Sequence, residues 1–300
     1  MEQDTKKGIA FAVLAAALYA FNAPVSKLLL DYMPPRLTAG LLYLGAGLGM
    51  AFIALLRRAG KRTRVESRLT KAELPYTAAM ILLDIAAPVC LMLGLGSTTA
   101  ANASLLNNFE IVATAVIAMA VFRERISPRL WAGIVCVTLS CAILSFKDIS
   151  SLQFSGGSLL VLLAAVFWGL ENNCWEKIST KDPMEIVLLK GIFSGTGSVL
   201  IGLCLGERIT ALWSVFAVLA TGLVSYGLSI FFYVYAQRLL GAARTSAYYA
   251  IAPFIAAALS FIVFRELPQI SYLAALAFMA AGAWLSSLDK PIFRRRSRTR

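Results

Sequence analysis

The residues with the clearest capacity for chemistry lie near the middle of the chain, between positions 164 and 176. Glu171 stands inside an apolar run that begins near Phe154, and Trp168 and Trp175 lie three positions before it and four after it. On a helix these spacings put both indoles on the same face as the carboxylate. A carboxylate between two aromatic rings can hold an organic cation by charge and by cation–π attraction.

Three other apolar segments carry polar side chains at similar helical spacing. Their members are Tyr19, Asn22 and Ser26; Asn107, Glu110 and Thr114, with Asn108 beside them; and Ser246, Tyr249 and Pro253. We expect the four helices to contribute to a central cavity, and we expect Glu110 and Glu171 to line that cavity together. Asparagine side chains also join helices within membranes by hydrogen bonds, so helix packing is the alternative role for Asn22, Asn107 and Asn108.

Glu110 and Glu171 are the least easily explained as packing residues. A charge at mid-membrane is unfavourable by about 2.5–3.5 kcal/mol, which suggests a task or a partner. The two groups could bind a cationic substrate, or they could carry a proton, because burial favours the protonated form of a carboxylic acid. A permanently protonated side chain that bonds to an asparagine is the structural alternative.

Four further residues within the apolar segments are candidates for the same site. Asp84 is a third acidic group, although a proline one turn later could make it a partner for freed backbone amides instead. Lys190 could pair with one of the buried carboxylates or extend to the membrane surface. Tyr226 and Tyr249 could wall an aromatic pocket or simply pack.

The composition shows where these side chains must reside. Of the 300 residues, 59% are hydrophobic and 15% are charged, whereas soluble domains average about 25% charged residues. The apolar residues fall in repeated blocks of about twenty, which is the length of a membrane-spanning helix. The sequence therefore predicts an all-α polytopic membrane protein in contact with the lipid bilayer.

Several function classes are disfavoured. Histidine is absent, and the five cysteines lie in apolar runs without metal-ligand spacing, so we expect neither a metal nor another cofactor. The net charge of +12 is concentrated partly in an arginine-rich stretch at 294–300. A topology signal or contact with anionic lipid explains that stretch better than nucleic acid binding.

Ten membrane-spanning helices can be counted, separated by short loops that often contain proline. Most of the 28 lysines and arginines then fall on the side of the N-terminus, so the positive-inside rule predicts that both termini are cytoplasmic. The expected spans are approximately 8–30, 36–56, 73–93, 98–121, 128–146, 154–176, 184–205, 211–236, 242–264 and 270–288.

The two halves of the chain resemble each other. Positions 121–124 and 263–266 both read Val-Phe-Arg-Glu, and Asn22 aligns with Glu171. Five spans per half is an odd number, so the two copies should insert with opposite orientations, as in transporters whose site lies near the midplane. We expect a first repeat over 1–149, a second over 150–289, and a basic cytoplasmic tail over 290–300.

The chain resembles the ten-span, EamA-like branch of the drug/metabolite transporter superfamily. The resemblance rests on the two Val-Phe-Arg-Glu span ends, on the Phe-Trp-Gly of 167–169 and on the small-residue segment 241–246. Members often carry a basic residue early in the second span of each half; Lys190 stands at such a place, but Leu42 occupies its counterpart. The resemblance implies transport of small metabolites, amino acids or organic cations by alternating access.

The expected function is a secondary transporter in the plasma or inner membrane that exports a small-molecule metabolite, with possible proton coupling. Exchange of nucleotide sugars or phosphorylated metabolites is an alternative that would need cationic groups in the cavity. An integral-membrane enzyme is disfavoured because catalytic motifs are absent from the sequence. We expect a monomer or a homodimer, and no catalytic residues.

Overall fold

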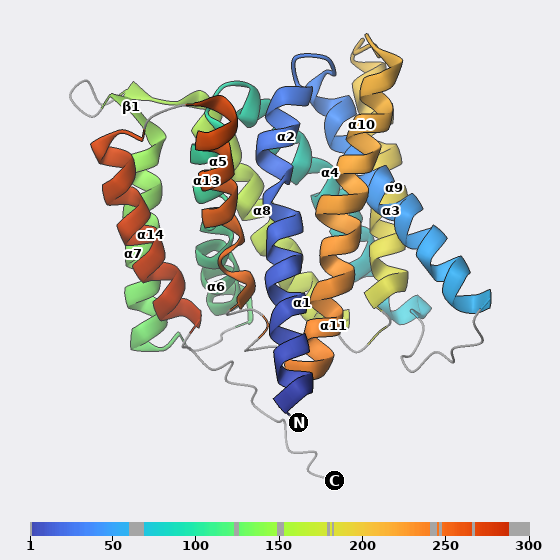
Figure 1. Ribbon diagram of the computed structural model, residues 1–300, viewed down its shortest axis with the longest axis horizontal. Helices are drawn as coiled ribbons and strands as arrows, with labels where there is room; N and C mark the ends of the chain where they lie inside the picture. Colours follow the sequence, from blue (N-terminus) through green and yellow to red (C-terminus); the bar gives the residue numbers. More distant parts are fainter. Residues whose placement is uncertain are drawn as a thin grey trace.

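The computed structural model describes residues 2–59, 69–122, 126–148, 153–178, 181, 183–240, 245, 248–265 and 268–287. Within these residues the chain forms a bundle of long helices, with one short antiparallel strand pair (Figure 1). The first half contains α1 (Glu2–Ala20), α2 (Asn22–Leu29), α3 (Pro35–Ala59), the 3-10 helix η1 (Lys71–Glu73), α4 (Leu74–Gly96), α5 (Ala100–Leu106), α6 (Phe109–Phe122), α7 (Pro128–Ser145) and the strand β1 (Phe146–Asp148).

The second half begins with a strand that closes the hairpin to β1, with Phe146 opposite Phe154. Its elements are β2 (Gln153–Phe154), α8 (Gly156–Ile178), α9 (Pro183–Cys204), α10 (Leu212–Gly222), the π-helix η2 (Leu223–Leu228), α11 (Ser229–Leu240), α13 (Ala252–Phe264) and α14 (Ile270–Ser287).

Eight of the described helical segments are long and apolar enough to cross a membrane, and two more apolar helices, Ala252–Phe264 and Ile270–Ser286, are shorter. Large apolar side chains stay exposed along them; Phe52, Phe216 and Ile262, for example, are 62%, 72% and 73% exposed. A soluble surface would not leave so many of these groups in water, but a bilayer accommodates them. The protein is therefore a polytopic membrane protein, as the sequence predicts.

The helices pack in a defined set of pairs. α3 lies against α9, α4 against α8, α1 against α11, and α7 against α14, while α5 packs against α13 and α6 against α8. The α3–α9 contact is a glycine seam, formed by Gly40, Gly47, Gly191 and Gly195. A Cβ placed on Gly191 would lie 2.5 Å from the Cα of Gly47, so the two backbones touch without side chains between them.

Three of the helical segments are interrupted inside the bundle. α1 and α2 are separated at Phe21, close to Pro24, which has no amide to donate to the ladder. α5 and α6 are separated by Asn107 and Asn108, and the segment that starts with α10 passes through the π-helix η2. Interruptions of this kind at membrane depth are tolerated where they are buried in protein or line a cavity.

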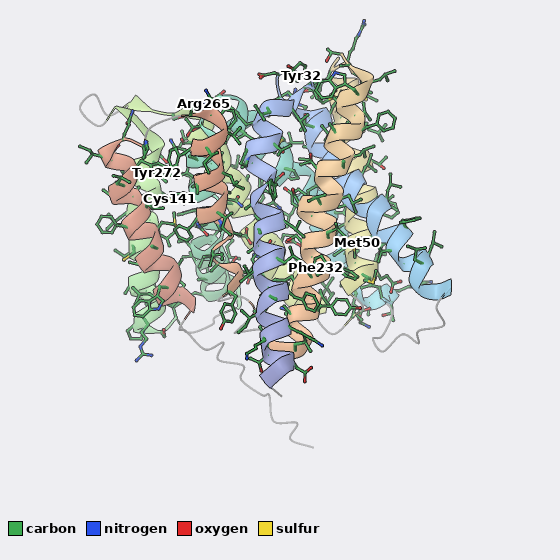
Figure 2. All side chains as sticks on the ribbon, in the orientation of Figure 1. Tyr32, Met50, Cys141, Phe232, Arg265 and Tyr272 are labelled. Carbon is green, nitrogen blue, oxygen red and sulfur yellow. The ribbon has the colours of Figure 1, made fainter. Side chains whose placement is uncertain are left out.

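The two ends of the bundle can be followed in the figures. α1 begins, α7 begins and α14 ends at one end, and α2 ends and α10 begins at the other (Figure 1). Tyr32 and Arg265 lie at this second end, and Phe232 lies nearer the first (Figure 2). The interrupted helices therefore run between two distinguishable faces, and the site described next lies between those faces.

Candidate functional site

A buried cluster of one lysine and two carboxylates forms the charged centre of the bundle. The Nζ of Lys190, on α9, lies 2.6 Å from the Oε1 of Glu171 on α8 and 3.0 Å from the Oδ2 of Asp84 on α4. The side chain of Asp84 is fully buried, and that of Glu171 is 7% exposed. We call these three residues the triad. The ammonium attracts both carboxylates strongly because little water screens these charges, and it offsets the repulsion between the two carboxylates.

A tyrosine that the sequence analysis did not single out completes the coordination of Asp84. The hydroxyl of Tyr43, on α3, donates to the Oδ1 of Asp84 at 3.0 Å. The indole Nε1 of Trp168 in turn donates to the Tyr43 hydroxyl at 3.3 Å. Trp168 is thus linked to Asp84 through the Tyr43 hydroxyl. The cation that lies beside Glu171 is the ammonium of Lys190.

An uncharged cluster lies across the same region. The Nδ2 of Asn22, at the start of α2, donates to the hydroxyl of Tyr226 in η2 at 3.0 Å. The Nδ2 of Asn107, at the break between α5 and α6, donates to the hydroxyl of Tyr19 at 3.2 Å. The interruptions of three helical segments are therefore linked by side-chain hydrogen bonds.

Aromatic contacts join this uncharged cluster to the triad. The ring of Tyr226 lies 5.3 Å from that of Tyr43 and 5.9 Å from that of Tyr19, and the Tyr19 ring lies 5.9 Å from that of Tyr249. Such ring pairs bury apolar surface while leaving their hydroxyl groups available for hydrogen bonds. The expected residues Asn22, Tyr19, Tyr226 and Tyr249 are therefore neighbours in space.

Glu110 occupies a different place from Glu171. Its Oε1 accepts a hydrogen bond from the Nδ2 of Asn172 at 2.6 Å, and the same amide lies 3.2 Å from the Oγ1 of Thr114. Glu110 lines a cavity of about 380 Å³, and Asp84, Glu171 and Lys190 are not among its lining residues. The lining residues are Glu110, Ile111, Thr114, Ala115, Ala118, Leu130, Asn172, Asn173 and Ser286.

Several buried polar atoms near the helix breaks have no hydrogen-bond partner among the described residues. They include the Oδ1 of Asn107, the Nδ2 of Asn108 and the Oγ of Ser225. Unpaired buried groups are destabilising unless water or a ligand meets them. The side chain of Trp175 and the whole of Ser246 lie outside the described residues, so the second indole expected beside Glu171 has no structural description.

Sequence reasoning missed Tyr43 and Asn172. Tyr43 directly follows Leu42, the position where a counterpart of Lys190 was sought, and Asn172 directly follows Glu171. Both could have been found by treating polar neighbours of the chosen positions as candidates. The described residues contain no group of three Asp, Glu, His or Cys side chains that could hold a metal ion.

Comparison with known proteins points to one family. The sequence pattern of the EamA-like transporter family matches residues 6–146 and again residues 155–288. A protein of Methanothermobacter thermautotrophicus described as an uncharacterized transporter is 26% identical over 270 residues, which cover 85% of this chain and 78% of that protein. A protein of known crystal structure, 18% identical, has the same fold with a TM-score of 0.65 over 99% of this chain and 98% of its own.

Proposed function

This chain belongs to the EamA-like transporter family, and from that premise we propose that it carries a small organic cation or zwitterion by alternating access. The observation that carries the proposal is the triad, in which two buried carboxylates already hold an ammonium group. A substrate with an ammonium group offers the same chemistry as the Lys190 side chain. The family makes the protein a membrane transporter; the substrate class is the new element.

The triad suggests how such a substrate is bound. Lys190 can remain with the fully buried Asp84 while an incoming ammonium takes its place at Glu171, the more exposed of the two carboxylates. The carboxylate of a zwitterionic substrate, such as an amino acid, can then face the freed side of Lys190. Charge remains paired at each stage, which avoids the large penalty of an isolated buried ion.

The tyrosine-rich side of the site suits the apolar part of the substrate. Tyr19, Tyr43, Tyr226 and Trp168 lie within ring contact or hydrogen-bonding distance of one another beside the triad. Aromatic faces attract organic cations and pack against their alkyl groups. We therefore expect binding to increase when a small ammonium gains a compact apolar group.

We also propose ten membrane-spanning helices in two inverted repeats, 1–149 and 150–289, with a basic tail at 290–300 and both termini cytoplasmic. The pairing of helices supports this arrangement: α4 packs on α8 as α11 packs on α1, and the remaining main pairs join one half to the other. In the two repeats Asn22 corresponds to Glu171, and Tyr226 corresponds to Asp84. The hydrogen bond from Asn22 to Tyr226 is then the uncharged counterpart of the link that Lys190 makes between Glu171 and Asp84. The glycine seam supports sliding of α3 on α9.

Export across the inner membrane, coupled to proton entry, is the direction that we propose. A buried carboxylate that releases its ammonium partner becomes a proton acceptor, so Glu171 can alternate between cation and proton. Exchange of phosphorylated compounds is less well supported, because the ammonium of Lys190 is already matched by two carboxylates.

The test uses the purified full-length chain in proteoliposomes with a pH gradient. A panel of amino acids, choline-like amines, polyamines and nucleotide sugars is first screened by ligand-induced thermal shift, and the stabilising compounds are then assayed for transport. Glu171→Gln should abolish both proton-driven transport and binding of the ammonium compounds. Glu185→Gln, the same chemical change near the start of α9, should leave both close to those of the unmodified protein. Undiminished transport by Glu171→Gln, or stabilisation by nucleotide sugars alone, would refute the proposal.

A further inference from the structure

We infer that the cavity around Glu110 is a second cation site, separate from the triad, which takes a small organic ammonium with an apolar body. The cavity measures about 380 Å³, a size that suits a small metabolite. Its walls are largely apolar, with Ile111, Ala115, Ala118 and Leu130 among them. Glu110 is the only charged side chain among the described residues that line the cavity. A mainly apolar chamber with one carboxylate favours a ligand that is cationic at one end and apolar at the other.

The surroundings of Glu110 favour a negative charge that faces a ligand. One carboxylate oxygen, Oε1, is fixed by the Nδ2 of Asn172 at 2.6 Å. Glu110 also lies in the first turn of α6, a 14-residue helix whose N-terminal amides stabilise a nearby anion. The lining residues that the structure describes include no lysine or arginine, although Lys190 and Asp84 act on Glu110 electrostatically from α9 and α4. A cation within the cavity would add a charged partner to the hydrogen bond that this carboxylate accepts from Asn172.

One polar atom that lines the cavity lacks a hydrogen-bond partner within the described part of the chain. The Oγ of Ser286, at the end of α14, is buried and has no hydrogen-bond partner among the residues that the structure describes. It lines the same cavity as Glu110. A buried hydroxyl without a partner is destabilising, and a bound ligand or water would relieve this.

The two cation sites share one helix but face different sides of it. Glu171 belongs to the triad and Asn172 to the Glu110 cavity, and consecutive residues on a helix point about 100° apart. α8 therefore forms a wall between the two sites. Glu110 and Glu171 nevertheless act on each other electrostatically.

The position of the cavity gives the second site its place in the transport cycle. Leu130 lies near the beginning of α7 and Ser286 near the end of α14, at the end of the bundle where α1 also begins (Figure 1). In the proposed topology this end is cytoplasmic. A substrate that moves outward would pass the Glu110 cavity before the triad. This order rests on the proposed function, whereas the cation selectivity of the cavity does not.

The selectivity can be measured without knowledge of the substrate. In the full-length chain, Ala115→Cys places a thiol on the cavity wall, and its labelling rate is compared for a trimethylammonium and a sulfonate methanethiosulfonate reagent. Peptide mass spectrometry reports modification at position 115 itself, so the five native cysteines do not interfere. The exposed native Cys204, at the end of α9, serves as an internal control in every sample.

We expect the cationic reagent to label position 115 faster than the anionic one. Glu110→Gln should reduce the ratio of these two labelling rates about tenfold, because it removes one nearby charge in a partly hydrated site. The ratio at Cys204 should not change. n-Butylammonium should slow labelling at position 115, whereas n-butanol should not, and Glu110→Gln should remove this protection. A charge preference that survives Glu110→Gln, or equal protection by the alcohol, overturns the second site.

Glu171→Gln separates this inference from the proposed function. In the Ala115→Cys chain it should leave the charge preference at position 115 intact while abolishing transport. Loss of the preference in Glu171→Gln would show that the two carboxylates act as one site and would refute the second site alone. Retained transport in Glu171→Gln, with a Glu110-dependent preference, would refute the proposed function and support the second site.

Discussion

Removal of the Lys190 ammonium should destabilise the protein by several kilocalories per mole. The Lys190→Met substitution keeps a side chain of similar length but leaves Asp84 and Glu171 without the cation that lies 3.0 and 2.6 Å from them. At these distances each Coulomb attraction amounts to about 5–6 kcal/mol at an effective dielectric constant of ~20. The gain from no longer burying the ammonium offsets much of this sum, so we expect a net loss of about 3–5 kcal/mol in the free energy of unfolding.

The decisive measurement is a double-mutant cycle. Lys190→Met, Asp84→Asn and the double variant are reconstituted in bicelles, and their free energies of unfolding are determined by SDS titration. Lys190→Met destabilises the protein because it leaves the carboxylates without a cation, and Asp84→Asn removes one of those carboxylates. The double variant should therefore lose about 1–3 kcal/mol less unfolding free energy than the sum of the two single losses. Effects that add within about 0.5 kcal/mol would refute the claim that the lysine and the aspartate act as a pair.

Two further changes test the packing and the uncharged cluster. Gly191→Ala should lower the free energy of unfolding by about 1–3 kcal/mol in the same SDS titration, because its Cβ would lie 2.5 Å from the Gly47 Cα and the backbone there cannot move aside. The control is Gly96→Ala, whose Cβ meets nothing within 4 Å and which should change stability by less than about 0.5 kcal/mol. Equal effects of the two substitutions would contradict the glycine seam. Tyr226→Phe keeps the ring but removes the hydroxyl that accepts from Asn22, so we expect the free energy of unfolding to fall by about 1–3 kcal/mol. An unfolding free energy equal to that of the parent protein would show that this hydrogen bond contributes nothing.

The helices were the part of the fold most accessible from the sequence. Span 36–56 was expected and α3 covers Pro35–Ala59; 128–146 was expected and α7 covers Pro128–Ser145. Hydrophobic length is a property of a single segment, so it can be read without knowledge of the neighbours. The interruption at Asn107 and the π-helix η2 were not anticipated, because they depend on contacts that each segment makes in the bundle.

For the candidate site, too, the sequence indicated features within single helices but not contacts between helices. Helical spacing placed Tyr19 and Asn22 together, and the structure links each of them to another expected residue, Asn107 and Tyr226. The sequence did not determine which of the three carboxylates pairs with Lys190, because the pairing depends on how α4, α8 and α9 pack together. Periodicity within one helix carries no information about that approach.

The same limit explains Glu110. The sequence suggested that it would share a cavity with Glu171, but its bond to Asn172 and the lining of its own cavity follow from the rotation of α8 between two neighbours. A rotation of α8 by one residue position would bring Glu171 to the place of Asn172, beside Glu110. Helical spacing could therefore show which polar residues share a helix face, but it could not show that Glu110 contacts Asn172 while Glu171 contacts Lys190.

The π-helix η2 sets the rotational phase between the two ends of one long segment. A π-turn closes its hydrogen bond over five residues instead of four, so it holds one residue more than the α-helical path would. Tyr226 lies inside this turn, and Ser229, just beyond it, donates to the carbonyl oxygen of Ala15 at 2.9 Å. Deletion of a single residue within η2 would restore an α-helical path with α10 and α11 close to their present phase, whereas a deletion beyond η2 would turn the rest of α11 by about 100° relative to α1. A one-residue deletion should thus preserve the packing of α11 on α1 when it falls within η2, although it displaces Tyr226, and should disrupt that packing when it falls within α11.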